Sequence, residues 1–261
     1  MRLFPMAYPT PDSLRSRLKR PISSITAYDY PAARLCDEAG VQMILVGDSL
    51  GMMVAGMEDT TEVTLDQMIY HTEIVRRGVK SAVLVSDLPI NTYRSPEETV
   101  VNATRLMEAG ADAVKLEGGF RQLEKIEALV EAGIACCAHL GMLPQRVREE
   151  GGYKKKGKKD EEAESLSAAA MALEQTGAFA IVLESVVADV ATKITKKLSI
   201  PTIGIGAGDY CDGQIRVLHD VIGGYPWFVP PFAKVYGNVA ETTSSSVKQY
   251  IRDIKAALQD D

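Results

Sequence analysis

A glycine that ends a helix, followed by a short apolar segment, recurs along the chain, and this repeat constrains the fold more than any other feature. Gly40, Gly110, Gly133 and Gly177 each end an EAG or QTG triplet, and the segments VQMILV, ADAVKL, IACCA and AFAIVL follow them. Glycine suits the left-handed residue that closes a helix, and continuously apolar strands are typical of parallel sheets covered on both faces. The repeat therefore predicts helices that alternate with parallel strands.

Further apolar segments bring the number of predicted strands to about eight. They are SSITAYD, SAVLVSD, IPTIGIG and QIRVLHD, at residues 23–29, 81–87, 200–206 and 214–220. Eight strand and helix units in about 250 residues are typical of a closed (β/α)8 barrel, the TIM barrel. A doubly wound open sheet is the alternative, because alternation alone does not show that the sheet closes.

We expect residues 1–261 to form one barrel domain, with three segments outside the repeat. Residues 1–20 are predicted as an N-terminal helical extension with Pro11 in its first turn. The segment from Thr242 has apolar residues at helical spacing and is predicted as a C-terminal helix. Residues 148–164, rich in glycine and lysine, are predicted as a mobile loop that closes over the site, with a plain solvated loop as the alternative.

The net charge and the cysteine usage favour a cytoplasmic protein that acts on small molecules. A formal charge of −6 over 261 residues argues against nucleic acid as a partner, because phosphate binding needs clustered cations. No apolar run reaches the length that spans a membrane, and the first residues lack the apolar segment of a secretory signal. The four cysteines show no disulfide or metal spacing, which favours reduced thiols.

Polar side chains stand where the predicted strands end. These side chains are Asp48, Asp87, Lys115, Glu117, His139 and Glu184. In a closed barrel the carboxyl ends of all strands meet at one face, which is where barrel enzymes keep their chemistry. Each residue alone would be an ordinary turn or capping residue, but six at equivalent positions predict a site.

The residue types in this set favour a hard divalent cation such as Mg²⁺, which binds oxygen ligands and leaves positions for water and substrate. Zinc would require more histidine or cysteine, and the chain has three histidines. His71 lies in a predicted helix and is expected to have a surface or packing role, whereas His219 is left open between packing and catalysis. The GIGAG of residues 204–208 lacks the full nucleotide-binding patterns and is interpreted as a loop in which the backbone approaches a ligand closely.

Ten segments also carry a resemblance to a known family. They are ITAYDYPAA, ILVGDSLGM, YHTEIVRRG, DLPINTY, AVKLEGG, AHLGMLPQ, GGYK, VLES, IPTIGIGAG and CDGQIRVLHD. In order and spacing, across residues 22–237, they resemble the signatures of the ketopantoate hydroxymethyltransferases. The lysine-rich KKGKKDEEAE that follows GGYK departs from the pattern expected of that family.

The resemblance implies a Mg²⁺-dependent (β/α)8 enzyme of pantothenate biosynthesis, related to the phosphoenolpyruvate/pyruvate barrel enzymes. Such an enzyme transfers the one-carbon unit of 5,10-methylenetetrahydrofolate to 3-methyl-2-oxobutanoate through an enolate that Mg²⁺ stabilises. The products are 2-dehydropantoate and tetrahydrofolate. The resemblance further implies a homodecamer built as a pentamer of dimers.

The resemblance also implies roles for individual residues. It implies that Asp48 and Asp87 bind Mg²⁺ and that Glu117 supports the ion, through water in our interpretation. The residues that it implies for holding the oxoacid or its product are Asp48, Ser49, Asp87, Lys115 and His139. It assigns Glu184 to proton transfer.

Chemistry favours Glu184 among the candidate bases that could take the proton from the oxoacid. Lys115 should stay protonated beside three carboxylates, and a metal close to Glu117 should weaken that residue as a base. His139 is placed against the carboxylate end of the substrate by the resemblance. Partial burial at the end of the strand AFAIVLE suits Glu184 for general-base catalysis. A purely structural role at the mouth of the barrel is the alternative.

Three other functions are considered for the whole chain. A related barrel lyase or class II aldolase would use the same metal and an oxoacid without folate. A Schiff-base aldolase would use Lys115 as its nucleophile. A non-catalytic binding protein could be built on the same barrel, because fold does not imply function.

Overall fold

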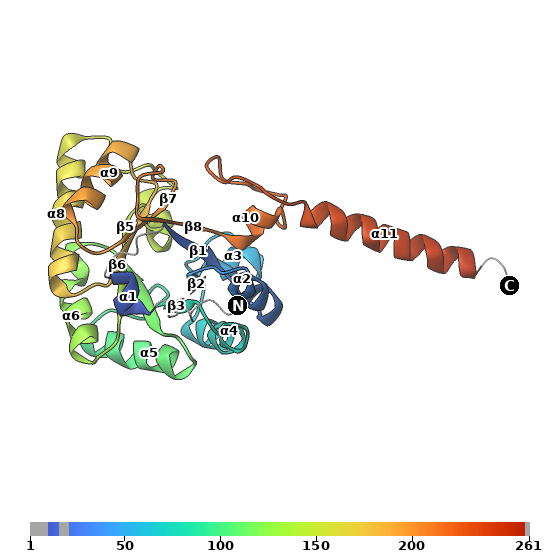
Figure 1. Cartoon of the computed structure of the whole chain (residues 1–261), viewed down its shortest axis with the longest axis horizontal. Helices are drawn as coiled ribbons and strands as arrows, with labels where there is room; N and C mark the ends of the chain where they lie inside the picture. The colour runs from blue at the N-terminus through green and yellow to red at the C-terminus, as the bar shows by residue number, and fades with distance from the viewer. Residues whose placement is uncertain (1–9, 16–20, 259–261) are drawn as a thin grey trace, which may run out of the picture. The chain divides into compact units, whose positions relative to one another are not determined.

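Eight parallel strands form a closed barrel in which each strand pairs with the next along the chain. The structure is a computed structural model that describes residues 10–15 and 21–258 (Figure 1). The strands are β1 (Ile22–Thr26), β2 (Met43–Val46), β3 (Val83–Asp87), β4 (Ala113–Glu117), β5 (Cys136–Gly141), β6 (Ala180–Glu184), β7 (Thr202–Ile205) and β8 (Gly213–Arg216). The barrel predicted from the repeat is confirmed, and the open sheet is excluded.

Helices alternate with the strands and surround them (Figure 1). The longer ones are α2 (Tyr30–Glu38), α4 (Leu65–Gly78), α5 (Pro96–Glu108), α6 (Leu123–Glu131), α8 (Asp160–Thr176) and α9 (Ala188–Lys197). The local sequence determines where these helices begin and end. Helix α4 begins with a reciprocal capping box formed by Thr64 and Gln67. Helix α8 is closed by Gly177, which has a φ of 106°, a conformation that favours glycine.

The interior of the barrel is filled by apolar side chains from the strands. Ile22, Met43 and Val83, each the first residue of its strand, belong to this core, and so does Leu14 of the short helix α1 (Pro11–Arg15). The N-terminal helix is thus anchored through Leu14, which is fully buried. The other residues of the predicted extension, 1–9 and 16–20, lie outside the described residues.

The strand register brings the predicted site residues into adjacent rows. Asp87 of β3 pairs with Lys115 of β4, and Glu117 of β4 pairs with His139 of β5. Glu184 of β6 pairs with Gly141, two residues beyond His139. Because side chains alternate along a strand, residues in such rows can face the same end of the barrel interior.

Two connections differ from the predicted boundaries. The segment 214–220 is strand only as far as Arg216, because the short helix α10 (Leu218–Ile222) follows and includes His219. The predicted mobile loop 148–164 contains helix α7 (Val147–Glu150) at one end and the first turns of α8 at the other. Its mobility stays a prediction.

The contacts within the chain define two compact units, Met1–Ile215 and Arg216–Asp261. The predicted single domain therefore stays a prediction. In the second unit, helix α11 (Val239–Ala257) confirms the predicted C-terminal helix and begins three residues before Thr242. None of its residues is buried. Within the described residues, no helix is both long and apolar enough to cross a membrane.

Candidate active site

Five of the six predicted strand-end side chains form a continuous row of opposite charges. The Nζ atom of Lys115 lies 3.0 Å from Oδ1 of Asp87 and 3.7 Å from Oε1 of Glu117. His139 continues the row, with Nδ1 3.3 Å from Oε1 of Glu117 and Nε2 3.3 Å from Oε2 of Glu184. The side chain of Glu184 is 15% exposed, while the other four are almost completely buried. Glu184 is therefore the member of the row that a ligand can reach most directly.

Asp48, the sixth side chain, joins the row from the end of β2. Its backbone N–H donates to Oδ2 of Asp87 over 3.1 Å, so the two aspartates lie side by side. Gly47 makes this approach possible, because a Cβ atom there would lie 2.9 Å from Oγ of Ser49 and 3.6 Å from Oδ2 of Asp87. The sequence Gly-Asp-Ser thus ends a buried strand on a carboxylate that faces a second carboxylate.

Ser49 lies beside this pair but is bound to a residue that the sequence did not single out. Its Oγ is 2.8 Å from the hydroxyl of Tyr28, a buried residue just after β1. The backbone carbonyl of Tyr28 in turn accepts a hydrogen bond from Nδ1 of His71 over 2.6 Å. His71 accordingly supports the backbone that carries Tyr28, in line with the packing role expected for it. His219 lies in α10, in the second unit.

The two aspartates hold their protons more tightly than ordinary aspartates. Burial raises the pKa of Asp48 well above its usual value, and the charges of Asp87 and Glu117 raise it further. Burial also raises the pKa of Asp87, although the charge of Lys115 and its close contact with the carboxylate act in the opposite direction. Two adjacent carboxylates with raised pKa values are donors that a cation would stabilise in the charged form.

Three further members of the row favour their charged forms, namely Lys115, His139 and Glu117. Burial alone would lower the pKa of Lys115, but the charges of Asp87, Glu117 and Asp48 outweigh it and raise this pKa. Burial and Lys115 would likewise lower the pKa of His139, but the charge of Glu117 and the close contacts with Glu117 and Glu184 raise it to about 9. Burial would raise the pKa of Glu117, yet its contacts with His139 and Lys115 bring it below its usual value.

These residues fit a divalent cation. Asp48 and Asp87 offer hard carboxylate oxygens, and Oδ1 of Asp87 is a buried oxygen without a well-aligned hydrogen bond, although Lys115 lies 3.0 Å away. Within the described part of the chain, no three His, Cys, Asp or Glu side chains are arranged to hold a metal by themselves. An ion bound by the two aspartates would therefore take its remaining oxygens from water or substrate.

Gln145 is a residue of the site that the sequence analysis missed. It lies in the 3-10 turn Pro144–Arg146 that follows β5 and is 2% exposed. Its Nε2 donates to Oδ2 of Asp48 over 2.8 Å, and its backbone N–H donates to Oε2 of Glu117 over 3.1 Å. It is the last residue of the AHLGMLPQ segment. That segment was the one signal that could have indicated it.

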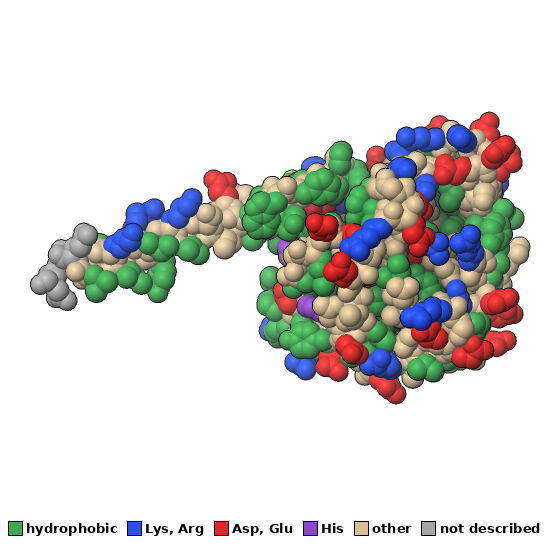
Figure 2. All heavy atoms as spheres, turned by 180° about the vertical axis from the view of Figure 1, so that it is seen from behind, with side chains coloured by type: hydrophobic (Ala, Val, Ile, Leu, Met, Phe, Trp, Pro, Cys, Tyr) green, Lys and Arg blue, Asp and Glu red, His purple; other side chains and the backbone are tan. Residues whose placement is uncertain are grey.

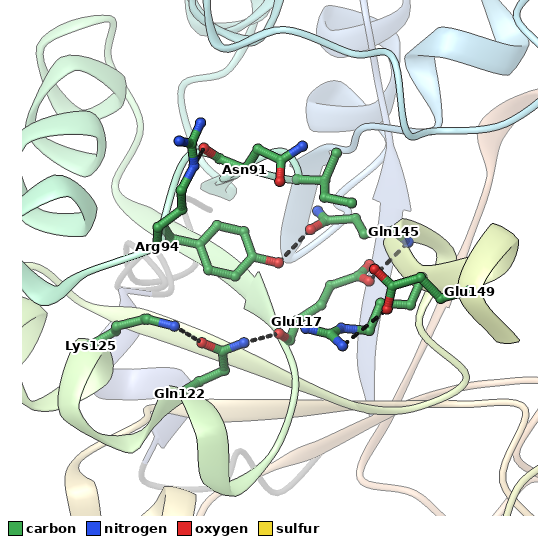
Figure 3. A pocket seen from close by; sticks show the side chains of 10 residues that line it. Asn91, Arg94, Glu117, Gln122, Lys125, Gln145 and Glu149 are labelled. Atoms are coloured by element: carbon green, nitrogen blue, oxygen red, sulfur yellow. Dashed lines mark hydrogen bonds and ion pairs between the residues drawn. The ribbon is translucent and has the colours of Figure 1, made fainter.

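A polar pocket opens beside Gln145 and Glu117 (Figure 3). Its lining residues are Ile90, Asn91, Tyr93, Arg94, Glu117, Gln122, Lys125, Gln145, Arg146 and Glu149. The side-chain Oε1 of Gln122 accepts from Nζ of Lys125 over 2.7 Å. The side-chain Nε2 of Gln122 donates to the backbone carbonyl of Glu117 over 2.9 Å. Neither aspartate is part of the lining, whereas Gln145, which bonds to Asp48, is.

The glycine loop 204–208 is constrained by the protein itself. A Cβ atom on Gly208 would lie 2.7 Å from Cβ of Ala188, and one on Gly204 would lie 3.0 Å from both Sγ of Cys211 and Nε2 of Gln214. Gly208 also has a φ of 86°. The close backbone approach expected here thus involves neighbouring protein atoms, and an approach to a ligand stays a prediction.

Comparison with known proteins places this geometry in a family. The family model for ketopantoate hydroxymethyltransferase matches residues 10–258. The 3-methyl-2-oxobutanoate hydroxymethyltransferase of Halalkalibacterium halodurans is 52% identical over 240 residues, which cover 91% of this chain and 86% of the relative. The protein of the same name from Pyrococcus furiosus is 49% identical over 238 residues, covering 91% and 84%.

Solved structures of more distant proteins share the fold. A phosphonopyruvate hydrolase in complex with oxalate and Mg²⁺ has a TM-score of 0.62 at 15% identity and covers 95% of this chain and 88% of its own. A 2,3-dimethylmalate lyase of the PEP mutase/isocitrate lyase superfamily has a TM-score of 0.61 at 18% identity, with coverage of 95% and 88%. This structural likeness concerns the barrel alone. The family match over residues 10–258 and the two relatives, 52% and 49% identical in sequence, show that the chain belongs to the ketopantoate hydroxymethyltransferase family.

Proposed function

We propose that the buried row of charges and the aspartate pair are the place where this chain carries out the reaction of its family. The activity is that of a 3-methyl-2-oxobutanoate hydroxymethyltransferase in pantothenate biosynthesis. The enzyme transfers a one-carbon unit from 5,10-methylenetetrahydrofolate to 3-methyl-2-oxobutanoate and gives 2-dehydropantoate and tetrahydrofolate. The observation that carries the proposal is the convergence of Asp87, Lys115, Glu117, His139 and Glu184 in one buried, ion-paired row.

The proposed cation site uses Asp48 and Asp87, with Glu117 as a supporting carboxylate. The raised pKa values of the two aspartates and the hard character of their oxygens support Mg²⁺ at this position. When bound, Mg²⁺ supplies positive charge that stabilises the negative charge developing on the oxoacid as its proton leaves. Glu117 is held by the Gln145 N–H and by its neighbours in the row, so its contact with the ion runs through water in this proposal.

The oxoacid would be held by positive and hydroxyl groups of the same cluster. Lys115 and His139 are both cationic at neutral pH, given a raised pKa for the former and a pKa of about 9 for the latter. They supply the charge that a carboxylate or an enolate oxygen requires. The Ser49 hydroxyl lies next to Asp48 in the chain and is oriented by the hydroxyl of Tyr28.

Glu184 is the proposed base, because the other candidates are occupied. Lys115 and His139 carry protons already, and Glu117 has Oε1 against both of them and Oε2 on the Gln145 N–H. Glu184 is the most exposed member of the row and has its other contact at Nε2 of His139. It would take the C3 proton of 3-methyl-2-oxobutanoate, leaving an enolate. Water would add to the methylene carbon of the folate, break its bonds to nitrogen and release tetrahydrofolate and a one-carbon unit at the oxidation level of formaldehyde. The enolate carbon would attack that unit, whose oxygen, supplied by the water, becomes the hydroxyl of 2-dehydropantoate.

A protonated Lys115 also weighs against the Schiff-base aldolase, because a nucleophilic lysine must be neutral. Borohydride with an oxoacid would trap such an enzyme, and EDTA would not affect it. We expect the opposite pattern, with no trapped adduct and loss of turnover in EDTA.

The deciding experiment separates binding of the oxoacid from transfer of its proton. Purified protein with Mg²⁺ and both substrates should form 2-dehydropantoate, and omission of Mg²⁺ should stop it. With folate absent, exchange of the C3 hydrogen into D₂O should be rapid in wild type and in Glu164→Gln, an exposed control on α8. The exchange should be at least about a hundredfold slower in Glu184→Gln. If Glu184→Gln binds the oxoacid normally and exchanges at the wild-type rate, Glu184 is not the base.

We further propose a homo-oligomer, a decamer by resemblance to the family. Helix α11 supports an assembly of copies, because Val247, Tyr250, Ile251, Ile254 and Leu258 are all exposed along it. Figure 2 shows hydrophobic side chains gathered along one side of this helix and Lys and Arg on the other. Light scattering at micromolar protein should give a mass well above the 28.3 kDa of one chain. A monomer would contradict the proposal.

A further inference from the structure

Gln145 joins three parts of the barrel mouth through hydrogen bonds to its side chain and backbone. Its Nε2 donates to Oδ2 of Asp48 after β2 and, over 3.0 Å, to the backbone carbonyl of Leu88 after β3. Its Oε1 accepts from the hydroxyl of Tyr93. Its backbone N–H donates to Glu117 at the end of β4. No other residue of the site is bonded in this way to both Asp48 and Glu117 within the described residues.

The orientation of the Gln145 amide is fixed by the chemistry of its partners. The backbone carbonyl of Leu88 can only accept, so the NH₂ group must face it, and the same group then reaches Asp48, whose ionised carboxylate also accepts. The remaining amide oxygen then faces the Tyr93 hydroxyl, which donates to it. A flipped amide would place its oxygen against two acceptors. The side chain therefore presents a fixed donor to Asp48.

A fixed donor on one oxygen determines where the other oxygen of a carboxylate points. Asp48 follows a glycine at the end of a buried strand, and its Oδ2 is the atom that Gln145 holds. With Oδ2 held, Oδ1 is left for a cation shared with Asp87. Groups that orient metal ligands in this way commonly change metal affinity ten- to a hundredfold when they are removed.

We propose that Gln145 is a positioning residue for the divalent cation, holding Asp48 in its ligating orientation while its backbone anchors Glu117. The inference rests on the proposed metal site and deepens it. Tyr93 takes part by holding the amide oxygen of Gln145. A mere packing role for Gln145 would affect stability alone, whereas the positioning role requires a change in metal affinity at unchanged fold.

The test is a titration of the full-length protein with Mn²⁺, followed by electron paramagnetic resonance of the free ion and by calorimetry. Gln145→Met keeps the length of the side chain and removes its hydrogen bonds, and it should weaken Mn²⁺ binding at least tenfold. Tyr93→Phe removes only the hydroxyl and should weaken Mn²⁺ binding about threefold. Gln122→Met is the matched control, since Gln122 is a buried side-chain amide of the same pocket that bonds to Glu117 only at its backbone carbonyl and has no bond to Asp48. It should bind Mn²⁺ as wild type does.

The outcomes separate this inference from the proposed function. If wild type and Asp48→Ala bind Mn²⁺ equally, the metal site itself is wrong. If Asp48→Ala loses Mn²⁺ while folded Gln145→Met binds within twofold of wild type, the positioning role alone is wrong. Circular dichroism and thermal melting establish folding. Should Gln145→Met fail to fold, Tyr93→Phe decides: weakened binding supports the role, and wild-type binding overturns it.

Discussion

The barrel mouth and helix α11 place opposite kinds of side chain in opposite environments. At the mouth, Asp87, Lys115, Glu117 and His139 are charged groups removed from water. Along α11, by contrast, large apolar side chains are exposed to it. Each arrangement costs free energy in an isolated chain, because buried charges lose hydration and exposed apolar surface gains nothing. The difference supports two separate proposals, a small charged ligand for the mouth and an apolar partner surface for α11.

The largest expected effect comes from removing a charge at the mouth. Asp48→Asn should lower Mg²⁺-dependent turnover at least about a thousandfold, because it removes a proposed metal ligand. In EDTA the same change should raise the free energy of unfolding by about 1 kcal/mol, since it relieves repulsion between buried carboxylates. Steady-state kinetics and urea unfolding measure the two. Lower stability in EDTA would show that the mouth is not strained by its charges.

The next effect tests the apolar side of α11. Ile254→Glu places a charge among the exposed apolar residues and should shift the oligomer towards smaller species, because burying that charge in an interface is costly. Ser245→Glu is the matched control, since it adds the same charge about half a turn away around the helix. Light scattering across a dilution series reports both. Equal masses for the two variants would show that the apolar side of α11 is not an interface between copies.

A smaller effect concerns pH. The folded pKa of His139 is about 9 against an ordinary 6.5, so the fold stabilises the charged form. This contribution is fully present below pH 6.5 and is lost as the pH rises through 9. The unfolding free energy of metal-free protein should therefore fall across this window, by at most about 1.4 kcal/mol per pH unit for one proton. His139→Gln should flatten that fall in urea titrations. A slope identical to wild type would contradict the pairing.

The smallest effect concerns the segment 148–164. Arg148 pairs with Asp59 over 2.7 Å and with Glu62 over 2.8 Å, contacts that hold this segment against the loop after β2. The pair with Glu62 is exposed and contributes little, whereas Asp59 is mostly buried. Arg148→Ala should therefore loosen the segment only slightly and raise the KM for the oxoacid by up to about fivefold. Lys159→Ala, also exposed in the segment, should leave KM unchanged.

Hydrogen exchange tests the lid itself. A mobile lid requires faster exchange of residues 148–164 without oxoacid than with it. Arg148→Ala should increase the exchange of the free protein further. Equal protection with and without oxoacid would argue for a plain solvated loop.

The sequence predicted the strand ends because two constraints act on each of them. An apolar run must stop where the barrel stops, and the first polar residue after it marks the face, as for Asp48 and Asp87. The boundary near His219 was wrong because VLH is apolar enough for either structure, and only the left-handed Gly223 that closes α10 decides for a helix. Periodicity alone does not distinguish short apolar segments.

Gln145, Tyr93 and Tyr28 were missed for a different reason. Each acts through a contact between loops that are far apart in the chain, such as the bond between Gln145 and Asp48, 97 residues away. Nothing in the local pattern of a Pro-Gln-Arg turn specifies its partner. The residues that carry charge were thus visible in the sequence, whereas those that orient them became visible only in the fold.

The row from Asp87 to Glu184 has a consequence for how its residues can be studied. From Asp87 to His139 each member lies within 3.7 Å of the next, so a proton added to or removed from one of these four groups changes the proton affinity of the other three. The titration curve of the enzyme then belongs to the row as a whole. Free-energy changes from substitutions at Lys115 and Glu117 will therefore not add. A double-mutant cycle between the two residues measures their interaction free energy, which neither single substitution reveals.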